Sequence, residues 1–74
     1  MEIKHAQGKD DYQNNAKKYV INMMKGSQKT LHIKNGCYYA ESLEYYVDFD
    51  TFEEVKKSGV KHIECDNCFL KTKK

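Results

Sequence analysis

Short apolar and β-branched runs, separated by turn signals, predict the elements of this chain. Residues 19–24 (Tyr-Val-Ile-Asn-Met-Met) and 30–33 (Thr-Leu-His-Ile) are predicted strands. Residues 25–28 (Lys-Gly-Ser-Gln) lie between them and form a turn signal, so we expect a β-hairpin. Residues 45–49 (Tyr-Tyr-Val-Asp-Phe) alternate in polarity and predict a third strand.

A helix is expected directly after the third strand. Thr51 and Glu54 fit the capping-box pattern, in which the hydroxyl and the carboxylate each accept a hydrogen bond from a backbone N–H that the helix leaves unpaired. Phe52 and Val55 lie on one helical face. Gly59 is well placed to end the helix in a left-handed conformation. Residues 60–63 then return the chain to an extended conformation.

The two ends of the chain look different from its middle. Residues 1–17 are polar, with few apolar anchors, and predict a flexible N-terminal arm. A short helix over residues 10–18 is the alternative. Residues 71–74 (Lys-Thr-Lys-Lys) form a basic tail. We therefore expect one folded domain over residues 18–70.

The size of the chain raises the question of what stabilises it. A chain of 74 residues with a hydrophobic fraction of 39% buries little apolar surface, and such domains often need a disulfide, a metal or a partner. Three cysteines are an odd number and argue against a disulfide framework. The charged start of the chain predicts no signal peptide, and no apolar run approaches the roughly 18 residues of a membrane helix. These features predict a cytoplasmic protein with reduced thiols and no membrane association.

The cysteines have the spacing of metal ligands. Cys65-x-x-Cys68 is one half of a zinc knuckle, and His32 and Cys37, on either side of the Asn35-Gly36 turn, can supply the other half. We predict one structural Zn²⁺ bound by His32, Cys37, Cys65 and Cys68, although such sites also accept iron. His62 competes with His32 as the fourth ligand. A redox Cys-x-x-Cys is disfavoured because the βαβ context is absent.

Together these predictions give an α+β fold. It consists of a small antiparallel sheet, made of the hairpin and an extra strand, with one helix packed on it around a single zinc site.

Several of these segments resemble the Ada-like zinc-binding module, over roughly residues 19–69. The resemblance rests on residues 19–22, 31–32, 37–40, 47–49 and 52–55, Gly59 and Cys65-x-x-Cys68. It implies a small sheet and a helix around one zinc ion, in modules often found in bacterial and phage proteins. This chain has four residues between His32 and Cys37, where the family pattern has three, and five between Gly59 and Cys65, where it has three. Methyl-phosphotriester repair is not expected, because the position that matches the methyl-accepting cysteine is His32, which has no thiolate.

The expected function is that of a binding module. Nucleic acid is the first candidate partner, with Lys25, Lys29, Lys34 and Tyr38 as candidate contacts, although the formal net charge of +2 is modest. A protein-interaction or accessory module, for example from a mobile element or phage, is the alternative. Enzyme activity is not expected, because four protein ligands leave no open position on zinc.

Overall fold

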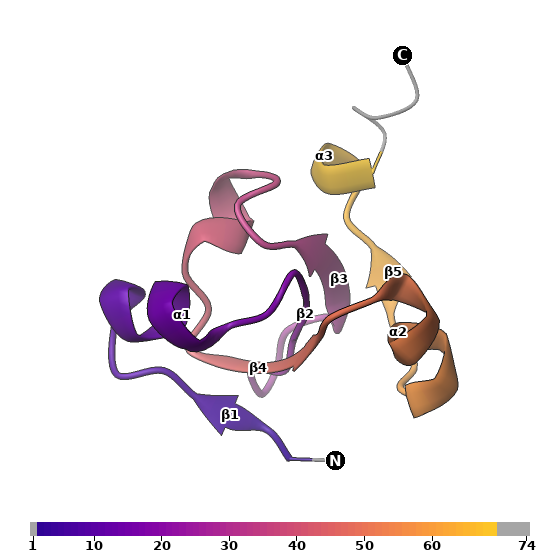
Figure 1. Cartoon of the computed structure of the whole chain (residues 1–74), viewed down its shortest axis with the longest axis horizontal. Coiled ribbons are helices and arrows are strands. Elements are labelled where there is room, and N and C mark those ends of the chain that lie inside the picture. Colours follow the sequence, from indigo (N-terminus) through magenta and orange to yellow (C-terminus); the bar gives the residue numbers. More distant parts are fainter. Residues whose placement is uncertain (1, 70–74) are drawn as a thin grey trace.

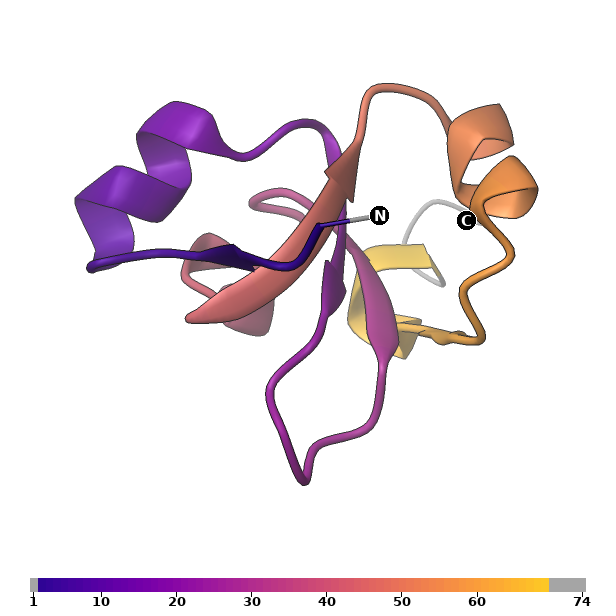
Figure 2. The ribbon, with the colours of Figure 1, turned by 90° about the horizontal axis from the view of Figure 1, so that it is seen from below.

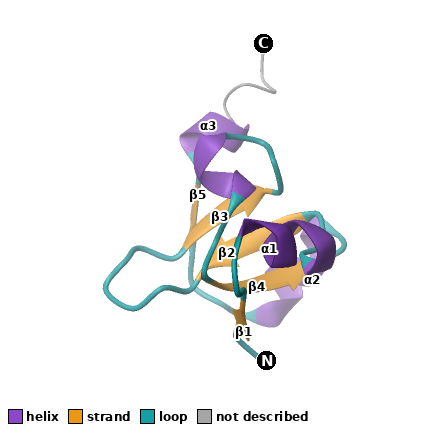
Figure 3. Ribbon diagram, turned by 90° about the vertical axis from the view of Figure 1, so that its left-hand side faces the viewer, coloured by secondary structure: helices purple, strands orange, loops and turns teal. Residues whose placement is uncertain are grey.

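The computed structural model describes residues 2–69 and contains one five-stranded sheet with helices on both of its faces (Figures 1 and 3). In chain order the elements are β1 (Lys4–His5), α1 (Lys9–Asn15), β2 (Tyr19–Asn22), β3 (Thr30–Ile33), the 3-10 helix η1 (Tyr38–Glu41), β4 (Tyr45–Phe49), α2 (Phe52–Ser58), β5 (Ile63–Glu64) and α3 (Asp66–Phe69).

The sheet has the order β1-β4-β2-β3-β5. The predicted hairpin is present, with Val20 opposite His32, and β4 pairs with the free side of β2. These pairings are antiparallel, as expected, and so is the pairing of β4 with β1, a strand that the sequence did not predict. β5 is different, because it runs parallel to β3. The α+β class is therefore confirmed, with a mixed sheet in place of a purely antiparallel one.

Each face of the sheet is covered by a different helix. Alternate residues of a strand point to opposite faces, so Val20 and Tyr46 face one side while Ile21 and Val47 face the other. The first pair packs with α1 and the second pair with α2. Figure 2 shows the two helices on opposite sides of the strands. The chain thus has two small apolar clusters in place of one thick core.

α2 begins and ends where its local sequence requires. The Thr51 hydroxyl accepts a hydrogen bond from the Glu54 backbone N–H at 3.2 Å, and the Glu54 carboxylate accepts one from the Thr51 N–H, also at 3.2 Å. Gly59 ends the helix with a φ of 74°. Both predictions are confirmed, and the buried Val55 holds the helix against the sheet.

The N-terminal segment is folded, so the prediction of a flexible arm over residues 1–17 is wrong for the described part of that segment. β1 pairs with β4, and α1 lies close to the alternative short helix over residues 10–18. The reason is one aromatic anchor: Tyr12 is fully buried and its ring packs edge-on against Tyr46. Its hydroxyl donates a hydrogen bond of 2.7 Å to the Ala40 carbonyl. A single well-placed aromatic side chain thus replaces the periodic apolar stripe that sequence patterns detect.

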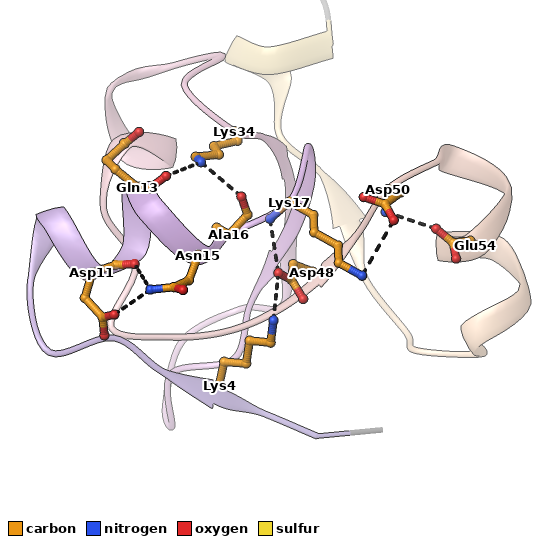
Figure 4. A network of polar contacts seen from close by, with 10 residues as sticks. All are labelled: Lys4, Asp11, Gln13, Asn15, Ala16, Lys17, Lys34, Asp48, Asp50 and Glu54. Carbon is orange, nitrogen blue, oxygen red and sulfur yellow. Dashed lines mark hydrogen bonds and ion pairs between the residues drawn. The ribbon is translucent and has the colours of Figure 1, made fainter.

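Polar contacts also fasten the N-terminal segment to the sheet (Figure 4). The Asp48 carboxylate accepts hydrogen bonds from the Lys4 ammonium and from the Lys17 backbone N–H, each at 3.1 Å. The Lys34 ammonium donates to the carbonyls of Gln13 and Ala16 at the end of α1. The predicted basic tail, residues 71–74, and residue 70 of the predicted domain lie outside the described residues.

Replacing Tyr12 with phenylalanine should destabilise the fold. Burial raises the pKa of the Tyr12 hydroxyl above its ordinary value, so the group stays a protonated donor, and its loss leaves a buried carbonyl without that partner. We expect Tyr12→Phe to lower the free energy of unfolding by about 1–3 kcal/mol in urea denaturation. Tyr38→Phe is the control, because Tyr38 is 81% exposed. Equal effects of the two substitutions would contradict the anchoring role of Tyr12.

Candidate metal centre

The parallel pairing of β5 with β3 brings the two halves of the predicted site together. The Ile63 N–H donates to the Lys29 carbonyl, and the Cys65 N–H donates to the Leu31 carbonyl, both at 2.9 Å. This ladder sets Cys65 beside the strand that carries His32. The Cys68 N–H donates to the Cys65 carbonyl at 3.1 Å, so the start of α3 turns the second thiol toward the same point.

His32, Cys37, Cys65 and Cys68 form one buried cluster. One ligand atom from each residue lies within 4.8 Å of the other three. The Sγ atoms of Cys37 and Cys65 are 3.7 Å apart, and His32 Nδ1 lies 3.6 Å from Cys37 Sγ and 3.7 Å from Cys68 Sγ. A disulfide needs sulfurs at about 2.05 Å, so these cysteines are free thiols, as their predicted role requires.

The spacings within the cluster agree with a tetrahedral metal site. Zinc binds sulfur at about 2.3 Å and imidazole nitrogen at about 2.0–2.1 Å, so the edges of a zinc tetrahedron measure roughly 3.8 Å between sulfurs and roughly 3.6 Å between sulfur and nitrogen. Three of the six donor separations, at 3.6–3.7 Å, match these edges to about 0.1 Å, and the other three lie within 4.8 Å. The four donors could therefore hold one metal ion.

The protonation states of the cluster also bear on metal binding. Burial lowers the pKa of His32, so its imidazole is neutral at pH 7, the form that binds a metal. Burial, with a smaller contribution from the adjacent Cys37 thiol, raises the pKa of the Cys68 thiol to about 12, so without a cation this thiol keeps its proton. A bound dication reverses this balance by stabilising thiolates, and metal binding at this cluster would release protons.

His62 lies outside the cluster. Its Nδ1–H donates a hydrogen bond of 2.8 Å to the Val60 carbonyl, and the residue is half-buried just before β5. Because β5 pairs with β3, the same ladder that brings Cys65 to the site also brings His32, from the neighbouring strand. The geometry therefore favours His32 over His62 as the fourth donor.

A tight turn shapes the loop between His32 and Cys37. The Gly36 N–H donates to the Ile33 carbonyl at 2.6 Å, and Asn35 takes a left-handed φ of 63° that asparagine tolerates. A Cβ at Gly36 would lie 2.8 Å from the Ile33 oxygen and 3.1 Å from Cys68 Sγ. Gly36 is thus needed for space beside the site, which the sequence turn signal alone did not reveal.

A second layer of contacts ties the site to the N-terminal helix. Ala40 is fully buried among the cysteines, and its N–H donates to the Cys37 carbonyl at 3.1 Å. Its carbonyl accepts from the Tyr12 hydroxyl and, at 3.2 Å, from the Asn35 N–H. Sequence reasoning missed this brace, and its only signal was a lone aromatic residue in a polar segment.

The four candidate nucleic-acid contacts do not form one basic surface. Lys25 and Lys29 are exposed in the loop between β2 and β3. Lys34 is half-buried, and its ammonium group bonds two carbonyls of the N-terminal segment. Tyr38 is exposed, but it lines a groove that also contains several carboxylates. Nucleic-acid binding therefore gains no support from this arrangement.

Comparisons of the chain with protein-family models, curated proteins and solved structures found no match. Among residues 2–69, no helix has both the length and the apolar character to cross a membrane. The feature of the chain that bears most directly on its function is therefore the buried histidine–cysteine cluster.

Adding a methyl group at Gly36 should disturb the cluster. Because the new Cβ would meet the Ile33 carbonyl and the Cys68 sulfur, we expect Gly36→Ala to destabilise the fold by about 1–3 kcal/mol. Gly8→Ala is the matched control, since a Cβ at Gly8 meets nothing within 4 Å. Urea denaturation of both variants gives the comparison. An unchanged free energy of unfolding in Gly36→Ala would show that the loop relaxes without cost.

Proposed function

We propose that this chain is a small structural zinc-binding module, with one Zn²⁺ bound by His32 Nδ1 and the thiolates of Cys37, Cys65 and Cys68. The observation that carries this proposal is the set of four buried donors, all within 4.8 Å of one another, with three of their separations equal to the edges of a zinc tetrahedron to about 0.1 Å. Three sulfur donors and one imidazole suit a borderline-soft ion such as zinc, and iron is the competitor in sulfur-rich sites.

The role of the ion in this proposal is structural. Four protein donors fill a tetrahedral zinc site and leave no position for water or substrate, so we infer that the centre is not catalytic. The donors come from β3, the loop after it, the residue after β5, and α3. One ion would therefore fasten the C-terminal segments to the hairpin. Three cysteines present as thiols fit a reducing compartment such as the cytoplasm.

Kinship with the Ada-like modules is part of the same proposal. It is supported by the kind and order of the donors, the helix that follows β4, and the Cys65-x-x-Cys68 turn. Within that kinship the module serves binding and not methyl transfer, because His32 stands at the first donor position. A protein is the partner that we favour over nucleic acid, since Lys34 is engaged inside the fold and Tyr38 lies among carboxylates.

Removal of the metal should unfold the domain. Native mass spectrometry of the purified protein should find one zinc per chain, and a strong chelator should remove both the ion and the dispersed amide NMR spectrum. The reason is that a structural zinc contributes several kcal/mol of folding free energy to a chain with so small a core. Retention of the native spectrum after complete removal of the metal would falsify the structural role.

Two histidine variants test the ligand set. His32→Gln should weaken zinc binding by more than the roughly 10- to 100-fold loss that follows removal of an outer-shell partner, because it removes a direct ligand. His62→Gln is the matched control and should bind zinc as the wild type does, since His62 lies outside the cluster. Competition against a chromophoric chelator measures both affinities. The reverse ranking would assign the fourth position to His62.

A further inference from the structure

A wide groove of about 860 Å³ lies beside the candidate metal centre. Its lining includes Asn22, Thr30 and His32, which occupy one face of β2 and β3. The segment of η1 and the link to β4 forms part of the lining, and residues 63–67 form another part. The groove is thus an uncovered part of the sheet face on which α1 packs elsewhere.

The groove has an acidic lining in a chain whose formal net charge is +2. Its charged side chains are one ammonium, from Lys9, and four carboxylates, from Glu41, Glu44, Glu64 and Asp66. Lys9 bonds Glu41 at 3.5 Å and His5 lies 3.6 Å from Glu44. Among residues 2–69, Glu64 and Asp66 have no cationic partner. The uncompensated negative charge is therefore concentrated on the stretch that contains Cys65.

Exposed apolar side chains accompany these carboxylates. Tyr38 is 81% exposed, Tyr39 is 64% exposed, and their rings pack edge to face with centroids 5.6 Å apart. Ile63 is 52% exposed and also lines the groove. Exposed aromatic rings next to carboxylates suit an alkyl chain that ends in a cation, because the ring faces attract the cation and the carboxylates neutralise it.

We propose that this groove binds a lysine-bearing segment of a partner protein, with lysine side chains lying over Tyr38 and Tyr39 and their ammonium groups near Glu64 and Asp66. We choose a lysine-bearing segment because its positive charge complements the carboxylates of the groove. The same carboxylates repel the phosphate backbone of a nucleic acid. This inference specifies the partner of the zinc-binding module proposed above. It rests on that proposal, because His32 and Cys65, two of the proposed zinc ligands, line the groove.

The test uses the zinc-containing chain of 74 residues and three labelled probes. The first is a peptide of alternating lysine and alanine, the second has glutamate in place of lysine, and the third is a thymidine oligonucleotide. Fluorescence anisotropy should show binding of the lysine peptide alone, and that binding should weaken in high salt. Amide NMR shifts caused by the peptide should concentrate on residues 38–44 and 63–67.

Matched variants locate the contact. Tyr38→Ala removes an exposed ring and should weaken the lysine peptide about two- to fivefold, the worth of an exposed cation–π contact. Tyr45→Ala is its control, because Tyr45 does not line the groove. Glu64→Gln should also weaken the peptide, whereas Glu53→Gln on α2 should not. Equal effects of a variant and its control, or stronger binding of the oligonucleotide, would overturn the proposal.

Two further measurements distinguish a failure of the groove proposal from a failure of the zinc proposal. Zinc content, measured for each sample, shows whether the module itself is intact: a zinc-loaded protein that ignores the lysine peptide refutes the groove proposal alone. A protein that binds the peptide through these residues without any metal refutes the zinc module alone. Neutralising Lys71, Lys73 and Lys74 to glutamine is the last control. Groove shifts in that variant without peptide would assign the groove to the chain's own tail and overturn the partner proposal.

Discussion

Four polar side chains buried within 4.8 Å of one another impose the main constraint on this fold. Three thiols and an imidazole cannot satisfy one another by hydrogen bonding alone, because sulfur is a weak donor and a weak acceptor. The cluster also lies where β3, β5 and α3 meet, and all three of these elements are short. The cation that we propose for this site would bind all four groups at once and join these elements more strongly than hydrogen bonds between them could.

The apolar clusters and the N-terminal helix support the histidine–cysteine cluster. The apolar clusters on the two faces of the sheet are small, and each is linked to the cysteines through one residue. On the α2 side Phe69 packs against both the apolar cluster and the cysteines. On the α1 side Ala40 packs among the cysteines, and its carbonyl accepts a hydrogen bond from the Tyr12 hydroxyl. The N-terminal helix is therefore coupled to the segments around the site by the buried Tyr12 ring and its hydroxyl, and by hydrogen bonds of Gln13 to Asn35 and to the Glu41 carbonyl. The groove lies beside the site, and His32 and Cys65 belong to both. Partner binding and metal binding would therefore depend on the same segments of the chain.

The sequence predicted the elements whose stability comes from neighbouring residues, and it predicted less well the elements that depend on contacts with distant parts of the chain. β3, β4 and α2 follow from alternation, a capping box and Gly59, which act within a few residues, and these predictions are confirmed. A helix near α1 was only the alternative to a flexible arm, because its stability comes from a distant carbonyl and from Lys34, which no local pattern contains. The four candidate ligands could be named from their spacing. His32 was preferred over His62 from its position beside Cys37, and the pairing of β5 with β3 adds a spatial reason that the sequence did not contain. The groove could not be predicted, because its lining comes from four parts of the chain.

The two outer strands have one further consequence. β1 and β5 are each two residues long, and each contains a charged residue, Lys4 in one and Glu64 in the other. An exposed sheet edge with unpaired N–H and C=O groups is a template on which other chains can add strands. Edges this short and this charged offer almost no template at either side of the sheet. In a protein with so small a core, such edge strands reduce the opportunity for a second chain to pair with the sheet.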